Sequence, residues 1–183
     1  MVNPAQAEAI TRRWLAEFVV GLNLCPFARP LLDSRQLRIA VCAEEAISAL
    51  QHCVLAELDR IQCASEEDIA TSLVVFTGGL SDFDDYLDFL ALCQQWLEES
   101  GLEGLVQLAS FHPDYRFEGE SSHSPGQFSN RSPYPTLHLI REDMLERVLV
   151  DFPDPEAIPG RNIAKLEDLG LEELERRWQA MFH

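Results

Sequence analysis

The run TSLVVFT, from Thr71 to Thr77, restricts the possible folds more than any other part of the sequence. It is short, apolar and rich in β-branched residues, and the glycine pair Gly78-Gly79 follows it. This pattern predicts a short buried β-strand that ends at the glycines. Strands of this kind are typical of layered folds in which helices cover a sheet.

Helical and strand patterns alternate on both sides of this run, in the order typical of α/β and α+β folds. Because the fourth strand follows the third without a helix, we expect these two to pair antiparallel. The sequence thus predicts an α/β (or α+β) fold, with a single layered domain over 1–183 and a mixed sheet of about four strands flanked by helices. Helices are expected from 4 to about 22, over 47–61, from 82 to 100, briefly from 143, and over 171–182; strands over 36–43, 71–77, 105–111 and 136–140; and a turn-rich connection over 152–160.

The chain is strongly acidic: 14 Lys and Arg residues stand against 31 Asp and Glu residues, and the formal net charge is −17. Such a surface repels nucleic-acid backbones and anionic lipids, and no basic run offsets it. The apolar stretch from Phe18 to Leu24 is too short to span a bilayer, and no signal peptide pattern opens the chain. We therefore expect a cytoplasmic protein that binds neither nucleic acid nor membrane; its oligomeric state is open.

The five cysteines give an odd count, and none forms a C-x-x-C pair. Cys42, Cys53, Cys63 and Cys93 lie within apolar patterns, where cysteine usually acts as a small buried hydrophobic residue. These features favour a reduced chain, in agreement with a cytoplasmic location.

A long irregular segment, residues 112–135, separates the third and fourth expected strands. Loops longer than about 15 residues are uncommon in compact domains and tend to be functional or disordered. Its middle part, Ser121 to Gln127, has no large apolar side chain. We interpret the segment as a candidate lid that is mobile without a ligand.

Polar side chains gather at the two ends of this segment. His112 ends the third strand, where open α/β sheets place ligand sites, and Asp114 is close enough to orient its ring. These residues are candidates for a general acid or base and its orienting group. Asn130 and Arg131 suit a carboxylate or phosphate, and Tyr134 lies beside them. An equally open alternative is that all of them only hold the loop in place.

His138 lies within the fourth strand and is a candidate ligand-binding residue; the alternative is a core histidine with a satisfied hydrogen bond. If the third and fourth strands are neighbours, His112, Asp114 and His138 form a candidate facial metal site. Their spacing matches no established zinc motif, so the sequence leaves the metal and any cofactor unknown.

Cys25 lies in LCPFARP, where Pro26 can begin a helical turn with Cys25 at its N-cap. The helix dipole would then lower the pKa of the thiol and make Cys25 a candidate catalytic nucleophile. The segment resembles the redox-active turn of thioredoxin-like proteins, and YPTLHLI resembles their proline-led strand. The context differs, because a helix precedes Cys25 where that fold requires a strand.

Four separated segments resemble one family over nearly the whole chain: GLNLCPFA, SFHPDY, NRSPYP with TLHLIRE, and IPGRNIAKLEDLG. The family is the bacterial domain of unknown function 1415. The resemblance implies a single cytoplasmic domain and supplies no reaction.

The residues favour an enzyme acting on a small anionic molecule, in a pocket between the HPD segment (His112–Asp114) and the NRSPYP segment (Asn130–Pro135). Two alternatives stay open. One is a non-catalytic small-molecule-binding or sensor protein with the same pocket. The other is a thioredoxin-like thiol redox protein that uses Cys25.

Overall fold

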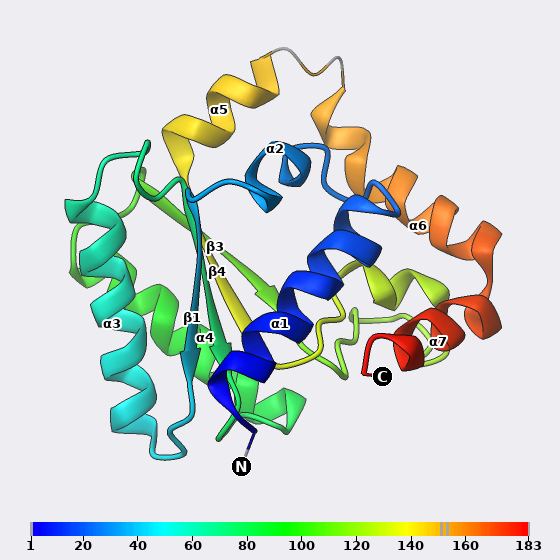
Figure 1. Cartoon of the computed structure of the whole chain (residues 1–183), viewed down its shortest axis with the longest axis horizontal. Helices are drawn as coiled ribbons and strands as arrows, with labels where there is room; N and C mark the ends of the chain where they lie inside the picture. The colour runs from blue at the N-terminus through cyan, green and yellow to red at the C-terminus, as the bar shows by residue number, and fades with distance from the viewer. Residues whose placement is uncertain (1, 151, 153, 183) are drawn as a thin grey trace.

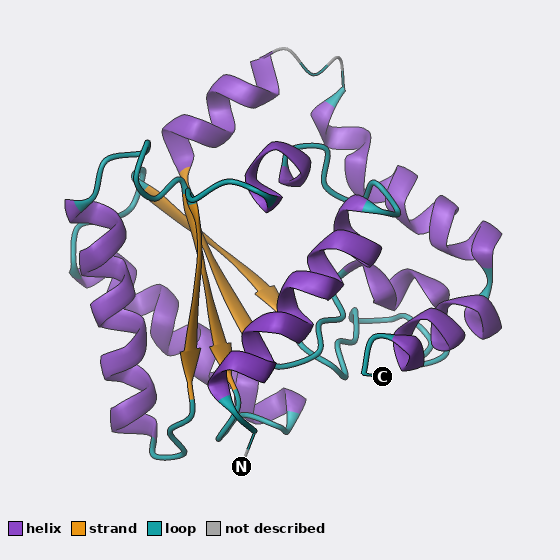
Figure 2. Ribbon diagram, viewed as in Figure 1, coloured by secondary structure: helices purple, strands orange, loops and turns teal. Residues whose placement is uncertain are grey.

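A mixed β-sheet forms the centre of the molecule, as the computed structural model shows for residues 2–150, 152 and 154–182 (Figures 1 and 2). In this described part, the strand order is β1-β2-β4-β3. β1 and β2 are parallel, and β4 runs antiparallel to both β2 and β3. The predicted α/β class, mixed sheet and antiparallel third and fourth strands are confirmed. The strands are β1 (Leu37–Cys42), β2 (Thr71–Phe76), β3 (Val106–Phe111) and β4 (Thr136–Arg141).

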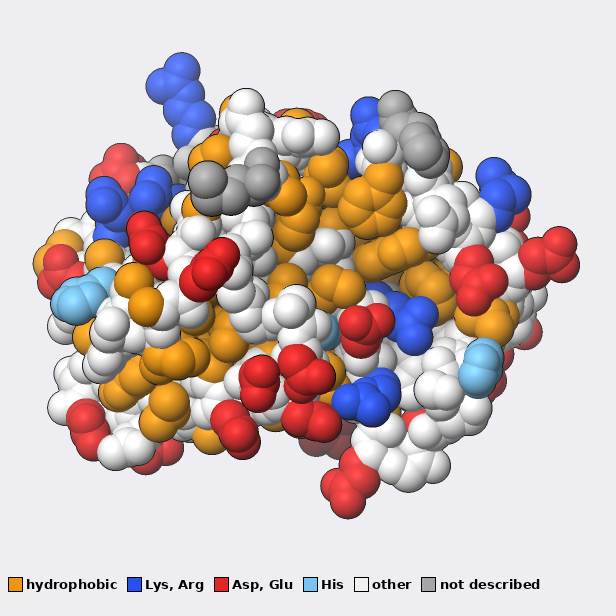
Figure 3. All heavy atoms as spheres, turned by 90° about the horizontal axis from the view of Figure 1, so that it is seen from below, with side chains coloured by type: hydrophobic (Ala, Val, Ile, Leu, Met, Phe, Trp, Pro, Cys, Tyr) orange, Lys and Arg blue, Asp and Glu red, His pale blue; other side chains and the backbone are white. Residues whose placement is uncertain are grey.

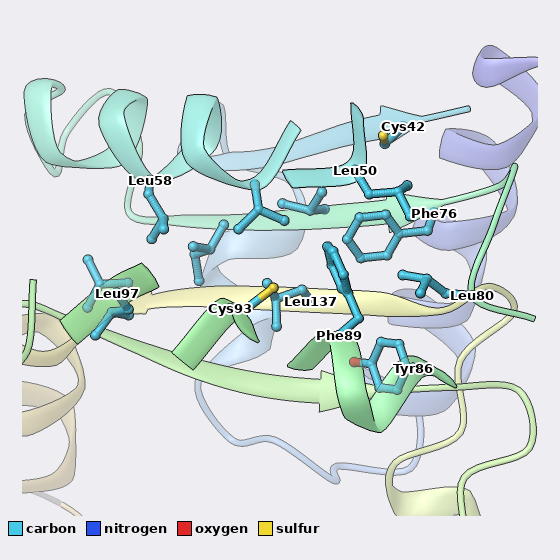
Figure 4. Close-up of a cluster of buried hydrophobic side chains, with 14 of the residues drawn as sticks. Cys42, Leu50, Leu58, Phe76, Leu80, Tyr86, Phe89, Cys93, Leu97 and Leu137 are labelled. Atoms are coloured by element: carbon cyan, nitrogen blue, oxygen red, sulfur yellow. The ribbon is translucent and has the colours of Figure 1, made fainter. Parts of the chain in front are cut away.

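Two long helices, α3 (Ile47–Cys63) and α4 (Phe83–Glu99), cover one face of the sheet. Their apolar side chains meet those of the strands in a continuous core, with Leu50 from α3, Phe89 from α4 and Leu137 from β4 among them (Figure 4). Asp82 is the N-cap of α4, because its carboxylate accepts hydrogen bonds from the backbone N–H groups of Asp84 and Asp85.

The opposite face is covered by α1 (Pro4–Trp14), which continues directly into the π-helical segment η1 (Leu15–Val20). A second core lies here, and it includes residues of α6 (Ile158–Leu169), α7 (Leu171–Ala180) and the 3₁₀ segment η2 (Pro125–Ser129). Phe18 stacks on Phe128 at 6.2 Å between ring centroids and meets the Trp178 ring edge-on at 5.7 Å. These aromatic contacts join the C-terminal helices to the sheet layer.

Three short helices complete the described structure: α2 (Ala28–Leu32), α5 (Glu142–Val150) and the 3₁₀ segment η3 (Pro155–Ala157). α5 begins directly at the end of β4. Figure 1 shows α2 and α5 beside each other at the upper end of the sheet.

The prediction of a turn-rich connection over 152–160 was wrong at its end, because α6 begins at Ile158, and no helix was predicted between this connection and 171. Pro159 and Gly160 suggested a break, but both lie in the first turn. Proline is tolerated there because the first backbone N–H groups of a helix have no helical partner.

Cys42 and Cys53 are joined by a disulfide between β1 and α3, with their Cα atoms 6.4 Å apart. Cys25, Cys63 and Cys93 are free thiols. The patterns around Cys42 and Cys53 predicted two separate reduced thiols, and the structure differs because the pairing depends on how α3 packs on the sheet.

Candidate functional site

An apolar pocket of about 120 Å³ lies between η1, α2, the sheet and α5. We call it the apolar pocket; its walls include Trp14, Leu32, Leu73, Phe111, Ile140 and Leu145. Almost all of its surface is hydrocarbon. The polar side chains in its lining are Cys25, Thr71 and His138.

His138 faces this pocket because of its position in β4. Its neighbours Leu137 and Leu139 point to the α3/α4 core, so the residue between them points the other way. The His138 Nε2 atom lies 2.5 Å from the Thr71 hydroxyl, which itself donates to the Leu139 carbonyl at 2.8 Å. A hydroxyl has one proton, so His138 Nε2 carries the hydrogen of this contact and the ring is the neutral Nε2–H tautomer.

Burial lowers the pKa of His138 to about 4, because the charged ring would be poorly solvated in this environment. At neutral pH the ring is therefore uncharged. Its Nδ1 atom makes no hydrogen bond within the described part of the chain, so the ring has one acceptor left for a ligand.

Cys25 lines the same pocket, on the turn that leads into α2. Burial raises the pKa of its thiol, and hydrogen bonds from the backbone N–H groups of Phe27 and Ala28 only partly oppose this effect. The prediction of a lowered pKa was wrong, because α2 begins at Ala28 and the sulfur lies in apolar surroundings. A desolvated thiol stays protonated and reacts slowly.

His112 lies on the other face of the sheet, fully buried between the rings of Phe83 and Tyr86 at 5.2 Å from each. Its Nε2 atom donates to the Leu80 carbonyl at 3.0 Å, and its Nδ1 atom accepts from the backbone N–H of Asp114 at 3.0 Å. Both ring nitrogens are thus occupied, and burial lowers the pKa of the ring. The Asp114 carboxylate is exposed. The backbone N–H of Asp114, rather than its side chain, therefore sets the tautomer of His112.

The NRSPYP segment pairs with His112 through the backbone only. His112 N–H donates to the Asn130 carbonyl at 3.1 Å, and Ser132 N–H donates to the His112 carbonyl at 3.4 Å. The Asn130 amide donates to the Ser110 carbonyl at 3.2 Å. The Arg131 guanidinium lies 4.6 Å from the centre of the Phe128 ring, on the α1 side of the sheet. Tyr134 is half-buried against the same core, which raises its pKa.

The side chains of His112 and Arg131 therefore pack against different cores, His112 beside Phe83 and Tyr86 and Arg131 beside Phe128. This geometry gives no support to one pocket shared by the HPD and NRSPYP segments. His138 and His112 are separated in the same way, and within the described residues no three His, Cys, Asp or Glu side chains converge as metal ligands. Of the candidate residues, Cys25 and His138 line one pocket.

The candidate lid is anchored at its centre. The buried Gln127 side chain accepts a hydrogen bond from Phe117 N–H at 2.8 Å and donates to the Ser121 carbonyl at 3.1 Å. Its exposed stretch runs from Glu118 to His123. Whether this stretch closes over a ligand stays a prediction.

Sequence reasoning missed Thr71 as a site residue. The only available signal was its place at the start of a buried strand, where a polar side chain needs a partner. Its partner is 67 residues away in sequence, and the pairing of β2 with β4 brings the two together.

The fold defines the chain as an α/β protein with a mixed sheet and helices on both faces. Within this class, a family model described as "Protein of unknown function (DUF1415)" matches residues 6–176, so the chain belongs to that family. The resemblance found in the sequence is confirmed. Comparison with curated proteins and with solved structures gave no match. Among the described residues, no helix has both the length and the apolar character needed to cross a membrane.

Proposed function

We propose that the protein binds a small, mainly apolar molecule in the apolar pocket. The observation that carries this proposal is a cavity of about 120 Å³ with hydrocarbon walls and one free imidazole acceptor. An engineered apolar cavity of about 150 Å³ is large enough to hold benzene. The apolar pocket, at about 120 Å³, is somewhat smaller, so a single ring or a short branched alkyl chain is the largest group that it suits.

The polar groups of the pocket define what else the ligand carries. Because His138 Nε2 is engaged with Thr71, only Nδ1 is free, and Nδ1 accepts hydrogen bonds without donating them. A ligand with a hydroxyl or N–H group is thus favoured over a pure hydrocarbon. Phenol combines the right size with one such donor and is a suitable first probe.

The lining supports binding better than catalysis. A cysteine nucleophile needs a lowered thiol pKa, usually beside a charged histidine. Here burial raises the pKa of Cys25 and lowers that of His138, so both groups are neutral at physiological pH. These pKa directions favour the binding or sensor function over a thioredoxin-like thiol function. Enzymatic action on a small anion between the HPD and NRSPYP segments stays a prediction, and neither the apolar pocket nor these pKa directions support it.

The test is a titration with phenol, in which binding is measured by the chemical-shift changes of the amide and methyl signals of the pocket residues in NMR spectra. Ala28→Leu adds carbon atoms to the pocket lining and should abolish the signal changes at Leu73 and Ile140. Ala56→Leu makes the same change at an exposed position of α3 and serves as the matched control. Phenol-induced changes that are scattered over the surface, or unaltered in Ala28→Leu, would contradict the proposal.

A further inference from the structure

A second, polar pocket lies on the other side of the turn that contains Cys25. It has a volume of about 170 Å³, and we define it by Asn23, Pro26, Phe152, Arg161, Asn162 and Lys165. Two segments far apart in sequence meet here, since the Asn162 amide donates to the Leu24 carbonyl at 2.7 Å. This bond holds α6 against the turn.

The Arg161 guanidinium is fixed in place at the edge of this polar pocket. It donates to the backbone carbonyls of Asp154 at 2.7 Å and Ala157 at 3.4 Å, and it lies 5.3 Å from the centre of the Phe152 ring. A guanidinium has about five N–H donors, so these two bonds leave several donors for a ligand. A fixed guanidinium also loses little entropy when it binds.

Lys165 follows Arg161 by four residues in α6, so the two cations lie on the same side of the helix. It is the only lysine in the sequence. Within the described residues, Lys165 forms no ion pair or hydrogen bond, and the polar pocket has no acidic side chain in its lining. Like charges at this spacing repel each other unless an anion lies between them.

The two cations of the polar pocket lie in a chain whose formal net charge is −17. Acidic side chains are spread over the face shown in Figure 3, as expected for a chain with 31 Asp and Glu residues. A small anion is therefore repelled by much of the surface and attracted to the polar pocket.

We infer that the polar pocket binds the phosphate group of a small phosphorylated molecule. Arg161 and Lys165 supply two charges, and the side-chain amides of Asn23 and Asn162 supply neutral polar groups beside them. Phosphate accepts several hydrogen bonds at once, and the guanidinium fork matches its geometry. The volume suits one phosphate group, and the acidic surface disfavours a nucleic-acid chain. This inference does not depend on the function proposed for the apolar pocket.

The test is a calorimetric titration of the full chain with inorganic phosphate, with chloride at matched ionic strength as reference. Lys165→Gln removes the positive charge and keeps a polar side chain that is only slightly shorter. This variant should bind phosphate about tenfold more weakly, or weaker still. Arg35→Gln removes an exposed arginine outside both pockets and should leave the affinity unchanged. Amide signals of Asn23 and Asn162 should shift on addition of phosphate.

An equal heat of binding in the Lys165→Gln and Arg35→Gln variants would overturn the inference, and so would an equal response to chloride. Acetate as effective as phosphate would overturn the assignment to phosphate. Ala28→Leu separates this inference from the proposed function, because it alters only the lining of the apolar pocket. Phosphate binding should persist in that variant, whereas phenol binding should be lost.

Discussion

Thr71 and His138 form a hydrogen-bonded pair across β2 and β4, with 2.5 Å between Oγ1 and Nε2. The Thr71 proton is directed to the Leu139 carbonyl, so the pair requires a hydrogen on His138 Nε2, and in the uncharged ring Nδ1 is then an acceptor. The pair thus joins the two central strands and fixes the one acceptor that the apolar pocket presents.

Acid should destabilise the protein through His138. The folded-state pKa is about 4, below the value of about 6.5 in an unfolded chain. Between these values the unfolded state binds a proton that the folded state does not, so stability is full above pH 6.5 and is lost as the pH falls toward 4. The expected loss from pH 7 to 4.5 is about 2 kcal/mol, measured by urea unfolding.

His138→Gln is the variant that isolates this effect. Glutamine can donate to Thr71 but does not titrate, so the variant should lose less stability over the same pH range. The lowered pKa of His112 acts in the same direction in both proteins and cancels in the comparison. Parallel stability curves for the two proteins would show that His138 is not the titrating group.

Cys25 should react slowly with iodoacetamide at pH 8, because burial raises its pKa and the apolar pocket limits access to the sulfur. Cys63, which is exposed, is an internal control on the same chain. Mass spectrometry of the two peptides should show earlier labelling of Cys63, and phenol should further protect Cys25 alone. Labelling of Cys25 with a midpoint below about 8.5 would restore the reactive thiol predicted from the sequence.

His112 should contribute to stability and not to ligand binding. Leu80 has a left-handed backbone with φ 62°, and its carbonyl accepts from His112 Nε2. His112→Ala leaves this carbonyl and the Asp114 N–H without partners and opens a cavity, so unfolding should become easier by about 2–4 kcal/mol.

His123→Ala is the control for this prediction, because that ring is exposed and, within the described part of the chain, its hydrogen-bond partner is the Ser122 hydroxyl. Phenol binding should be unchanged in both variants. A His112→Ala protein that keeps its stability but loses ligand binding would return His112 to the functional site.

The candidate lid should show two exchange regimes. The amides of Ser121 and Ser122 are exposed and should exchange quickly, whereas Phe117 N–H is bonded to buried Gln127 and should exchange slowly. Gln127→Ala should accelerate exchange at Phe117 by about tenfold, and Gln95→Ala, at an exposed glutamine of α4, should not. Slow exchange at Ser121 and Ser122 without a ligand would rule out a mobile lid.

Local patterns were sufficient to predict the four strands and most of the helices. β-Branched runs such as the one at Thr71 and four-residue spacings such as Trp14 to Phe18 need no distant partner to be recognised. α6 was missed because Pro159 and Gly160 look like a break when their place in the first turn is unknown. The strands and the helices with a clear apolar spacing were thus predictable, whereas a helix that begins with proline and glycine was not.

The candidate site was less predictable, because it depends on long-range pairing. Cys25 and His138 were both candidates, but only the packing of α2 on the sheet places them in one pocket. His112 and Arg131 were expected to share a site, because pairing of β3 with β4 brings the two ends of the segment 112–135 together. The backbones do meet, but the His112 ring packs beside Phe83 and Tyr86 and the Arg131 guanidinium packs on Phe128.

The alternation of Leu137, His138 and Leu139 along β4 has a consequence for how this chain tolerates insertions and deletions. Removing a single residue before His138 would move the side chains that follow it in β4 to the opposite face of the sheet. The imidazole would then enter the leucine-rich core against α3 and α4, and a leucine would replace the acceptor of the apolar pocket. The chemistry of the pocket thus depends on the register of β4, which decides the face of the sheet on which each side chain lies.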